Sequence, residues 1–213
     1  MKYKAYLFDL DGTLLDTLAD LAVSVNYALE AHQLPLRTET EVRRFLGNGV
    51  ERLIADAVPP QTPEKCYKEV LQTFRTYYLE HCMDHTAPYP GIMSLLQALK
   101  SEGAKLYVIS NKPDNAVQSL AHRYFKEYMD YAVGESETVR RKPCPDALLK
   151  AIRHAGVSMS EAVYVGDSEV DIETARRAGV DCLSVTWGFR DRDFLVESGA
   201  TVLIDHPADI LCM

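Results

Sequence analysis

The stretch KAYLFDLDGT, residues 4–13, contains a short apolar segment that ends in two closely spaced acids. The apolar run over residues 4–10 has the length of a buried strand and stops at an Asp-Gly pair, which signals a turn. It predicts a strand with Asp9 and Asp11 at its carboxyl end. In an open parallel sheet, ligands bind beyond the carboxyl ends of the strands, so these two acids are candidates for a binding site.

From residue 88 onward, apolar strands alternate with helical patterns. A helical face over residues 92–99 is ended by Gly103, and an apolar β-branched run follows it. Near-continuous apolar strands that alternate with helices are typical of a parallel, doubly wound sheet. The predicted strands are LYVIS (106–110), YAVG (131–134), AVYVGD (162–167), CLSVTW (182–187) and TVLID (201–205).

Residues from about 16 to 85 show helical periodicity alone, and Thr38 with Glu41 forms a capping-box pattern there. This block interrupts the α/β pattern just after its first strand, so it is predicted to be an inserted helical cap. The predicted fold class is α/β, a Rossmann-like doubly wound parallel sheet with an α-helical cap. The predicted domains are a catalytic core of residues 1–15 and 86–213 and a cap of residues 16–85.

Further polar residues follow the later strands or precede the next helix. They are far apart in sequence, so only the fold would bring them together. Because parallel strands share one edge for their carboxyl ends, we expect these residues to meet Asp9 and Asp11 there. They are Ser110 and Asn111, Lys142 before a helix predicted over residues 143–155, Gly166, Asp167 and Ser168, and Asp171 one helical turn later.

Asp9 and Asp11 suit the two roles that phosphoryl transfer to a carboxylate requires. Asp9 is predicted to attack phosphorus directly. Asp11 is predicted to protonate the leaving oxygen and later to deprotonate a water molecule. A phosphate dianion does not approach bare carboxylates, so a hard cation with oxygen ligands is expected. Mg²⁺ suits Asp9, Asp167 and one backbone carbonyl.

Hydrogen-bond donors and a cation are predicted to hold the phosphoryl oxygens. The Ser110 hydroxyl, the Asn111 amide and the Lys142 ammonium are the candidates. Asp171 is expected to orient Lys142 as a supporting residue, with direct metal contact as the weaker alternative. The other residues assigned to the site are Gly12 and Thr13, which are predicted to bind phosphate, and Ser168, which is predicted to support the site beside Asp171.

Four motifs stand in order along the chain: DLDGT (9–13), Ser110 after a hydrophobic strand, the lysine of RKP (141–143), and GDS (166–168) followed by Asp171. In this combination the sequence resembles the haloacid dehalogenase superfamily. The resemblance covers the whole chain, and the predicted helical insertion is similar to the small cap of that superfamily.

Within the superfamily, the sequence looks most like the phosphoglycolate phosphatases. The resemblance implies that Asp9 is the nucleophile, that Asp11 is the acid/base, and that Asp9, the Asp11 carbonyl and Asp167 hold Mg²⁺. Ser110 stands where threonine is also common, and the loop over 134–143 is more charged than usual. The stretches that carry the likeness are FDLDGTLLDT (8–17), FLGNGVERL (45–53), YPGI (89–92), SNKP (110–113), RKPCPD (141–146) and VGDSEVDIETARRAG (165–179).

The cap sequence contains one candidate for substrate selection. The turn Gly47-Asn48-Gly49 resembles the substrate-specificity loop of the family, and Arg52 follows it. The Asn48 and Gly49 amides or Arg52 would then meet a substrate carboxylate, although a solvent-exposed helix charge is the simpler interpretation of Arg52. The turn favours 2-phosphoglycolate or a similar small phosphorylated metabolite.

Three other functions stay open at this stage. Inorganic pyrophosphatases and hexose-phosphate mutases of the same superfamily keep all four motifs. Dehalogenases lack the second acid, so Asp11 argues against them. A signalling module that accepts a phosphoryl group on Asp9 without turnover belongs to a different class, and receiver domains of that class have about half this length and no helical insertion.

The composition argues against two kinds of partner. Among 213 residues there are 31 acidic and 23 basic side chains, for a net charge of −8. Nucleic acids and anionic membranes require clustered Lys and Arg, so neither is an expected partner.

No apolar run approaches the roughly 20 residues of a membrane helix. Five scattered cysteines without a CxxC pair suggest reduced thiols, and we expect a cytoplasmic protein that is a monomer or a homodimer.

Overall fold

The computed structural model describes residues 2–213. The chain forms two compact units. The core unit comprises Met1–Leu15 and Pro88–Met213, and the helical unit comprises Asp16–Ala87. Where the chain passes between the units, two short strands, β2 (Leu15–Asp16) and β3 (Ala87–Pro88), form a small sheet of their own.

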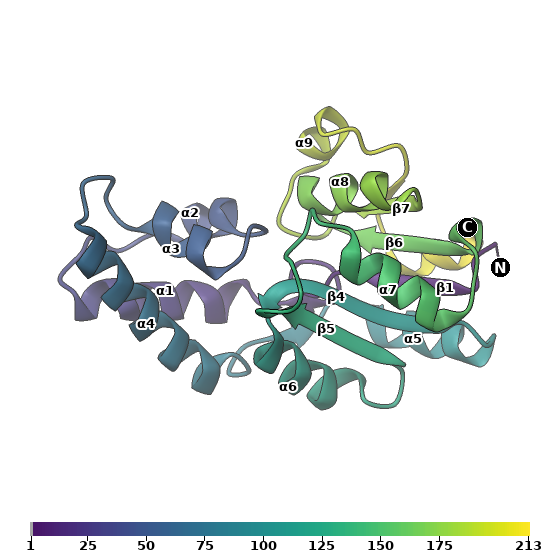
Figure 1. Cartoon of the computed structure of the whole chain (residues 1–213), viewed down its shortest axis with the longest axis horizontal. Helices are drawn as coiled ribbons and strands as arrows, with labels where there is room; N and C mark the ends of the chain where they lie inside the picture. The colour runs from purple at the N-terminus through teal and green to yellow at the C-terminus, as the bar shows by residue number, and fades with distance from the viewer. Residues whose placement is uncertain (1) are drawn as a thin grey trace. The chain divides into compact units, whose positions relative to one another are not determined.

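The core unit is built on a parallel sheet of six strands within residues 2–213, in the order β5-β4-β1-β6-β7-β8 (Figure 1). β1 therefore lies in the interior of the sheet, between β4 and β6. The bounds are β1 (Ala5–Phe8), β4 (Lys105–Pro113), β5 (Tyr131–Glu135), β6 (Ala162–Gly166), β7 (Asp181–Val185) and β8 (Leu203–Ile204).

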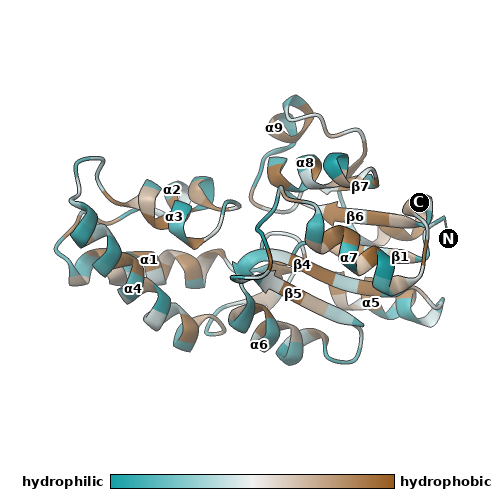
Figure 2. Cartoon of the chain, viewed as in Figure 1, coloured by the Kyte–Doolittle hydropathy of each residue, from teal (hydrophilic) through white to brown (hydrophobic). Residues whose placement is uncertain are grey.

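Helices cover both faces of this sheet. Successive side chains of a strand point to opposite faces, and every side chain of β1 is buried. Ala5 and Leu7 share one core cluster with buried side chains of α7 and α8, whereas Tyr6 and Phe8 face the opposite layer. Figure 2 shows the apolar character of the central strands. The core helices are α5 (Ile92–Ser101), α6 (Asp114–Phe125), α7 (Asp146–Ala155), α8 (Glu169–Ala178) and α9 (Arg192–Glu197), with 3-10 turns at Met159–Glu161 and Pro207–Cys212.

The strand order reverses at the middle of the sheet, where a ligand crevice is expected. After β1 the chain continues to β4 and β5 on one side and then returns to β6 on the other. Ligands in such sheets bind where the strand order reverses, beyond the carboxyl ends. The predicted α/β doubly wound fold is confirmed, and the residues after β1, β4 and β6 converge at this point.

The helical unit consists of four α-helices among its described residues. The capping box of Thr38 and Glu41 is confirmed at the start of α2. α3 was not predicted as a separate helix, because it has only eight residues and its N-cap is Gly49, which offers no capping side chain. Within residues 2–213, no helix combines the length and the apolar composition that crossing a membrane requires. The bounds are α1 (Leu18–Ala31), α2 (Glu39–Phe45), α3 (Val50–Ala57) and α4 (Glu64–His81).

A buried carboxylate ties the beginning of the helical unit to its end. Asp20 of α1 accepts hydrogen bonds from the backbone N–H groups of His85 (2.9 Å) and Thr86 (2.9 Å). The His85 ring Nδ1 lies 2.8 Å from the same carboxylate. Burial alone would raise the pKa of Asp20, but hydrogen bonds from Thr86 and His85 outweigh that effect and lower the pKa. The ionised form of Asp20 therefore stabilises the folded unit.

Asp20→Asn should lower the free energy of unfolding by about 1–3 kcal/mol at neutral pH, because an amide NH₂ would face a backbone donor in the buried site. The pKa of Asp20 is lower in the folded than in the unfolded chain. Its contribution is thus present above the unfolded pKa of about 3.9 and is lost as the pH falls through the folded value. Urea unfolding from pH 7 to pH 3 should show the difference between variant and parent shrink only below about pH 4.

Asp84→Asn is the matched control, because exposed Asp84 also pairs with a histidine ring, His81 Nδ1 at 2.8 Å. Exposed pairs contribute little to stability, so this variant should unfold almost as the parent does. Equal losses in the two variants would contradict the role given to Asp20.

Candidate active site

Asp9 follows β1 directly at the carboxyl edge of the sheet. Its backbone N–H donates to the Val165 carbonyl of β6 (2.8 Å), so the strand ladder extends up to this residue. The Leu10 N–H donates to Asp9 Oδ1 (2.7 Å), which orients the carboxylate. The side chain is buried. Asp9 thus has a fixed position at the crevice.

A tight loop after Asp9 brings the DLDGT motif (9–13) against the GDS motif (166–168). The Leu10 carbonyl accepts hydrogen bonds from the N–H groups of Leu14 (3.0 Å) and Leu15 (2.9 Å). Gly12 has a φ of +81°, and a Cβ at this position would lie 2.3 Å from Asp167 Oδ2. Both the backbone conformation and the lack of space therefore require glycine here. Asp167 packs directly against this loop.

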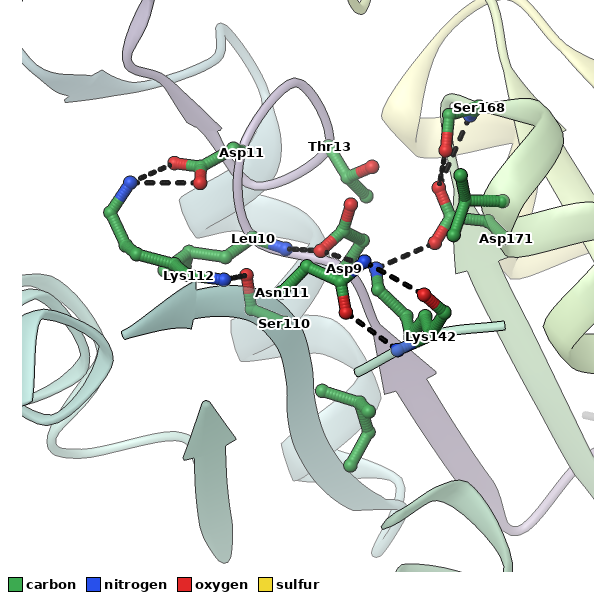
Figure 3. Close-up of polar contacts among 12 residues, drawn as sticks. Asp9, Leu10, Asp11, Thr13, Ser110, Asn111, Lys112, Lys142, Ser168 and Asp171 are labelled. Carbon is green, nitrogen blue, oxygen red and sulfur yellow. Dashed lines mark hydrogen bonds and ion pairs between the residues drawn. The ribbon is translucent and has the colours of Figure 1, made fainter. Parts of the chain in front are cut away.

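The ammonium of Lys142 bridges two buried carboxylates. Its Nζ lies 2.8 Å from Asp9 Oδ1 and 2.7 Å from Asp171 Oδ1, as Figure 3 shows. Burial alone would lower the pKa of Lys142, but Asp171 and Asp9 outweigh that effect and raise it. Lys142 is therefore charged, and it neutralises part of the negative charge at the site.

Asp167 is the third carboxylate of the cluster. Its Oδ2 accepts a hydrogen bond from the Phe189 N–H (2.7 Å), and its Oδ1 accepts one from the Thr13 hydroxyl (3.3 Å). Burial raises the pKa of Asp167 well above its usual value, and the charges of Asp171 and Asp9 raise it further. Burial likewise raises the pKa of Asp9, against the opposing effect of Lys142. The three carboxylates of Asp9, Asp167 and Asp171 therefore carry more negative charge than the single Lys142 ammonium offsets.

The arrangement fits a hard divalent cation. Asp9, Asp167 and Asp171 each offer a carboxylate oxygen, and these oxygens lie within 4.8 Å of one another. Asp171 uses Oδ1 for Lys142 (2.7 Å) and Oδ2 for the Ser168 hydroxyl (2.6 Å) and backbone N–H. Asp9 and Asp167 are therefore the better placed ligands, and oxygen ligands with excess negative charge suit Mg²⁺.

Two side chains predicted to hold phosphate have other partners in the structure. The Asn111 amide donates to the Lys142 carbonyl (3.1 Å), and its oxygen accepts from the Lys142 N–H (2.6 Å). The Thr13 hydroxyl bonds to Asp167. Asn111 therefore positions Lys142, and Thr13 positions Asp167. Ser110 lies at the same edge, where its hydroxyl accepts from the Lys112 N–H (3.2 Å).

Comparison with known proteins assigns the family. Residues 6–185 match the family model described as haloacid dehalogenase-like hydrolase. The chain belongs to this family. The match includes the loop after β1, the end of β4, Lys142 and the end of β6, so all parts of the crevice lie within it.

The relatives of this hydrolase include named phosphatases. It is 33% identical to N-acetylmuramic acid 6-phosphate phosphatase of Pseudomonas aeruginosa, over 99% of this chain and 94% of the relative. It is 34% identical to phosphoglycolate phosphatase of Aquifex aeolicus, over 87% of this chain and 86% of the relative. The crystal structure of a predicted phosphoglycolate phosphatase from Haemophilus somnus superposes with a TM-score of 0.92 at 31% identity, over 100% of this chain and 98% of that one. The predicted superfamily and the predicted phosphatase class are confirmed.

Two residues that contact the candidate site residues were not predicted. Lys112 Nζ lies 2.7 and 2.8 Å from the two carboxylate oxygens of Asp11. Tyr164 of β6 is buried, and its hydroxyl lies 3.1 Å from Lys142 Nζ and 3.1 Å from Asp171 Oδ1. A tyrosine within the aliphatic strand AVYVG was the available signal for Tyr164. Lys112 stands between Asn111 and Pro113, where its sequence context resembles a loop.

The predicted substrate-selecting residues lie in the helical unit. Asn48 and Gly49 stand in the turn between α2 and α3, where Gly47 and Gly49 have positive φ values of 106° and 82°. Arg52 is on α3 and forms an ion pair with Asp56, with Nε and Oδ2 2.7 Å apart. Their contact with a substrate stays a prediction.

Proposed function

We propose that this chain is a Mg²⁺-dependent phosphate monoester hydrolase that forms a transient phospho-aspartate on Asp9. The observation that carries the proposal is the placement of Asp9: buried after the central strand, 2.8 Å from the Lys142 ammonium, and in one carboxylate cluster with Asp167. A fixed carboxylate beside a cation is suited to attack a phosphoryl group whose charge the cation offsets.

In the first half-reaction, a carboxylate oxygen of Asp9 forms a bond to phosphorus while the bond from phosphorus to the ester oxygen breaks. Asp11 transfers a proton to the departing oxygen, so the alcohol leaves neutral. Lys142 and Ser110 bind phosphoryl oxygens, while Asn111 holds the Lys142 backbone in place. The contacts of Asn111 with the Lys142 backbone and of Lys142 with Asp9 support this division of roles.

In the second half-reaction, Asp11 accepts a proton from a water molecule as the water oxygen attacks phosphorus. The bond between phosphorus and the Asp9 oxygen breaks, which releases inorganic phosphate and restores the carboxylate. Asp11 ends each half-reaction in the form that the next one needs, so one residue serves as both acid and base.

Asp9, Asp167 and the carbonyl of Asp11 are the groups proposed to hold Mg²⁺. When bound, this cation offsets the negative charge of the phosphoryl oxygens and of the carboxylates. Support comes from the raised pKa values of Asp9 and Asp167, because burial and like charges disfavour ionisation until a cation is present.

The proposed substrate is 2-phosphoglycolate or a similar small phosphorylated metabolite that also carries a carboxylate. Relatives named phosphoglycolate phosphatase support this choice. A second candidate is N-acetylmuramic acid 6-phosphate, because the relative of that name matches over 94% of its own length. The turn Gly47-Asn48-Gly49 and Arg52 are proposed to meet the substrate carboxylate.

The test is phosphate release from a panel of esters with Mg²⁺ and with EDTA. The panel holds 2-phosphoglycolate, N-acetylmuramic acid 6-phosphate, glucose 1- and 6-phosphates, a nucleotide and pyrophosphate. A carboxylate-bearing ester should lead by about tenfold or more in kcat/KM, since the other esters lack the group that the Asn48 and Gly49 amides or Arg52 are proposed to bind. EDTA should lower the rate by about 100-fold or more. Asp167→Asn, which keeps the side-chain shape, should be slow under both conditions.

Other outcomes would point to the alternative functions. Preference for pyrophosphate, or interconversion of the glucose phosphates, would assign the chain to those branches of the superfamily. Labelling of Asp9 without phosphate release would indicate a phosphoacceptor. Release that is insensitive to EDTA and to Asp167→Asn would contradict the proposed metal site. A cytoplasmic location and a monomeric or homodimeric state stay predictions.

A further inference from the structure

Lys112 forms a two-point ion pair with Asp11. Its Nζ lies 2.7 Å from Asp11 Oδ1 and 2.8 Å from Oδ2, as Figure 3 shows. The Lys112 side chain is 2% exposed, whereas that of Asp11 is 21% exposed. A lysine is rarely buried to this degree unless it is paired. Burying an ammonium costs free energy, which its contact with Asp11 must offset. The pair of Lys112 and Asp11 therefore differs from an ion pair at the protein surface.

The backbone aims Lys112 at Asp11. The pairing of β4 with β5 shifts register between Ile109 and Pro113, and such irregularities re-aim side chains near active sites. The Lys112 N–H donates to the Ser110 hydroxyl (3.2 Å). A Cβ on Gly134 of β5 would lie 2.5 Å from the Lys112 carbonyl oxygen, so β5 packs closely under this segment.

Asp11, in contrast, stands on a loop at the edge of the crevice. The backbone beside it is tied by the Gly12 N–H, which donates to the Leu15 carbonyl (2.9 Å). This bond fixes the main chain next to Asp11. In Figure 3 the Asp11 carboxylate points toward Lys112 and away from Asp9. The buried Lys112 ammonium contacts both oxygens of this carboxylate and so holds it in this direction.

We propose that Lys112 is a positioning residue for Asp11 that keeps the acid/base anchored throughout the reaction. One Asp11 oxygen stays on the ammonium while the other turns to the ester oxygen, gives it a proton and later takes one from water. Lys112 stays protonated and exchanges no atom. The inference rests on the proposed function of Asp11. It gives Lys112, the lysine of the SNKP stretch, a role other than binding phosphate.

The test compares the first turnover of Lys112→Met on two kinds of ester. The leaving group of p-nitrophenyl phosphate departs without a proton. The leaving group of an alkyl ester must be protonated as it departs, and the alkyl ester used is 2-phosphoglycolate or the one that leads the panel. Alcohol formation from the alkyl ester in a single turnover should slow by about 100-fold, the scale of general-acid catalysis. The first-turnover burst of p-nitrophenolate should stay within about threefold of wild type, because its expulsion does not use Asp11 as an acid.

Two further variants serve as controls. Lys112→Arg keeps two donors for the carboxylate and should recover most of the alkyl-ester rate. Lys100→Met removes a lysine whose Nζ lies 2.8 Å from Asp130, a carboxylate that is likewise 21% exposed and belongs to the same unit. That variant should leave both first-turnover rates unchanged, since neither residue belongs to the crevice.

The outcomes separate this inference from the proposed function. Equal slowing of both esters by Lys112→Met, a raised KM for both, or no change at all would each overturn the positioning role. If wild-type protein and Asp9→Asn released p-nitrophenolate equally fast in the first turnover, the phospho-aspartate mechanism itself would instead be wrong.

Discussion

Asp9→Asn should abolish turnover and leave the protein folded. We expect kcat to fall by about 10⁴-fold or more, the scale observed when a covalent nucleophile is lost. An amide is too weak a nucleophile to attack phosphorus. The other two carboxylates of the cluster are engaged elsewhere: Asp171 is bonded to Lys142 and Ser168, and Asp167 accepts hydrogen bonds from Phe189 and Thr13. Phosphate release from the leading ester of the panel is the measurement.

The structure explains why the fold should survive this change. The backbone bond from Asp9 to Val165 and the shape of the side chain are both retained. Circular dichroism and thermal unfolding should resemble those of wild type.

Asp146→Asn, at an exposed ion pair with Arg140, is the control for loss of a charge. Mass spectrometry should verify Asn at position 9, because deamidation restores the nucleophile. A wild-type rate in verified variant protein would refute the mechanism.

The convergence of the candidate site residues was predictable because it depends on topology. Strand ends could be identified from apolar runs that stop at polar residues, and parallel strands place those ends at one edge. Asp9, Ser110 and Asp167 follow from this argument alone. The ion pair of Lys142 with Asp171 was also expected, and the structure gives it a length of 2.7 Å. Their catalytic and metal-binding roles stay proposals.

The direction of individual side chains could not be predicted in the same way. Lys112 points to Asp11 because of the register shift at the end of β4, and no local pattern announces such a shift. Asn111 has the chemistry of a phosphate ligand, yet its amide matches the Lys142 peptide, which lies 31 residues away in sequence. Thr13 has the same ambiguity, since a hydroxyl serves a carboxylate as well as a phosphate.

Lys142→Met should damage both stability and activity, because it removes the ammonium between two buried carboxylates. Breaking a buried ion pair from one side costs about 3–5 kcal/mol. Asp9 and Asp171 would face each other without the cation that now lies within 2.8 Å of both. We also expect kcat/KM to fall by about 10³-fold, the scale for removing a group that stabilises transition-state charge. Urea unfolding in EDTA and phosphate release in Mg²⁺ measure the two effects.

A second substitution separates charge from packing in that result. Asp171→Asn added to Lys142→Met removes the carboxylate that the first change leaves unpaired, so the double variant should regain part of the lost stability without regaining activity. Lys105→Met is the control, because its ammonium is exposed and lies 3.8 Å from Asp130. An unfolding free energy for Lys142→Met within about 1 kcal/mol of wild type would mean that the buried carboxylates are neutral without Lys142. In that case the cluster would have no excess of negative charge, from which we infer a divalent cation. Both the metal site and the ionised nucleophile would then need another explanation.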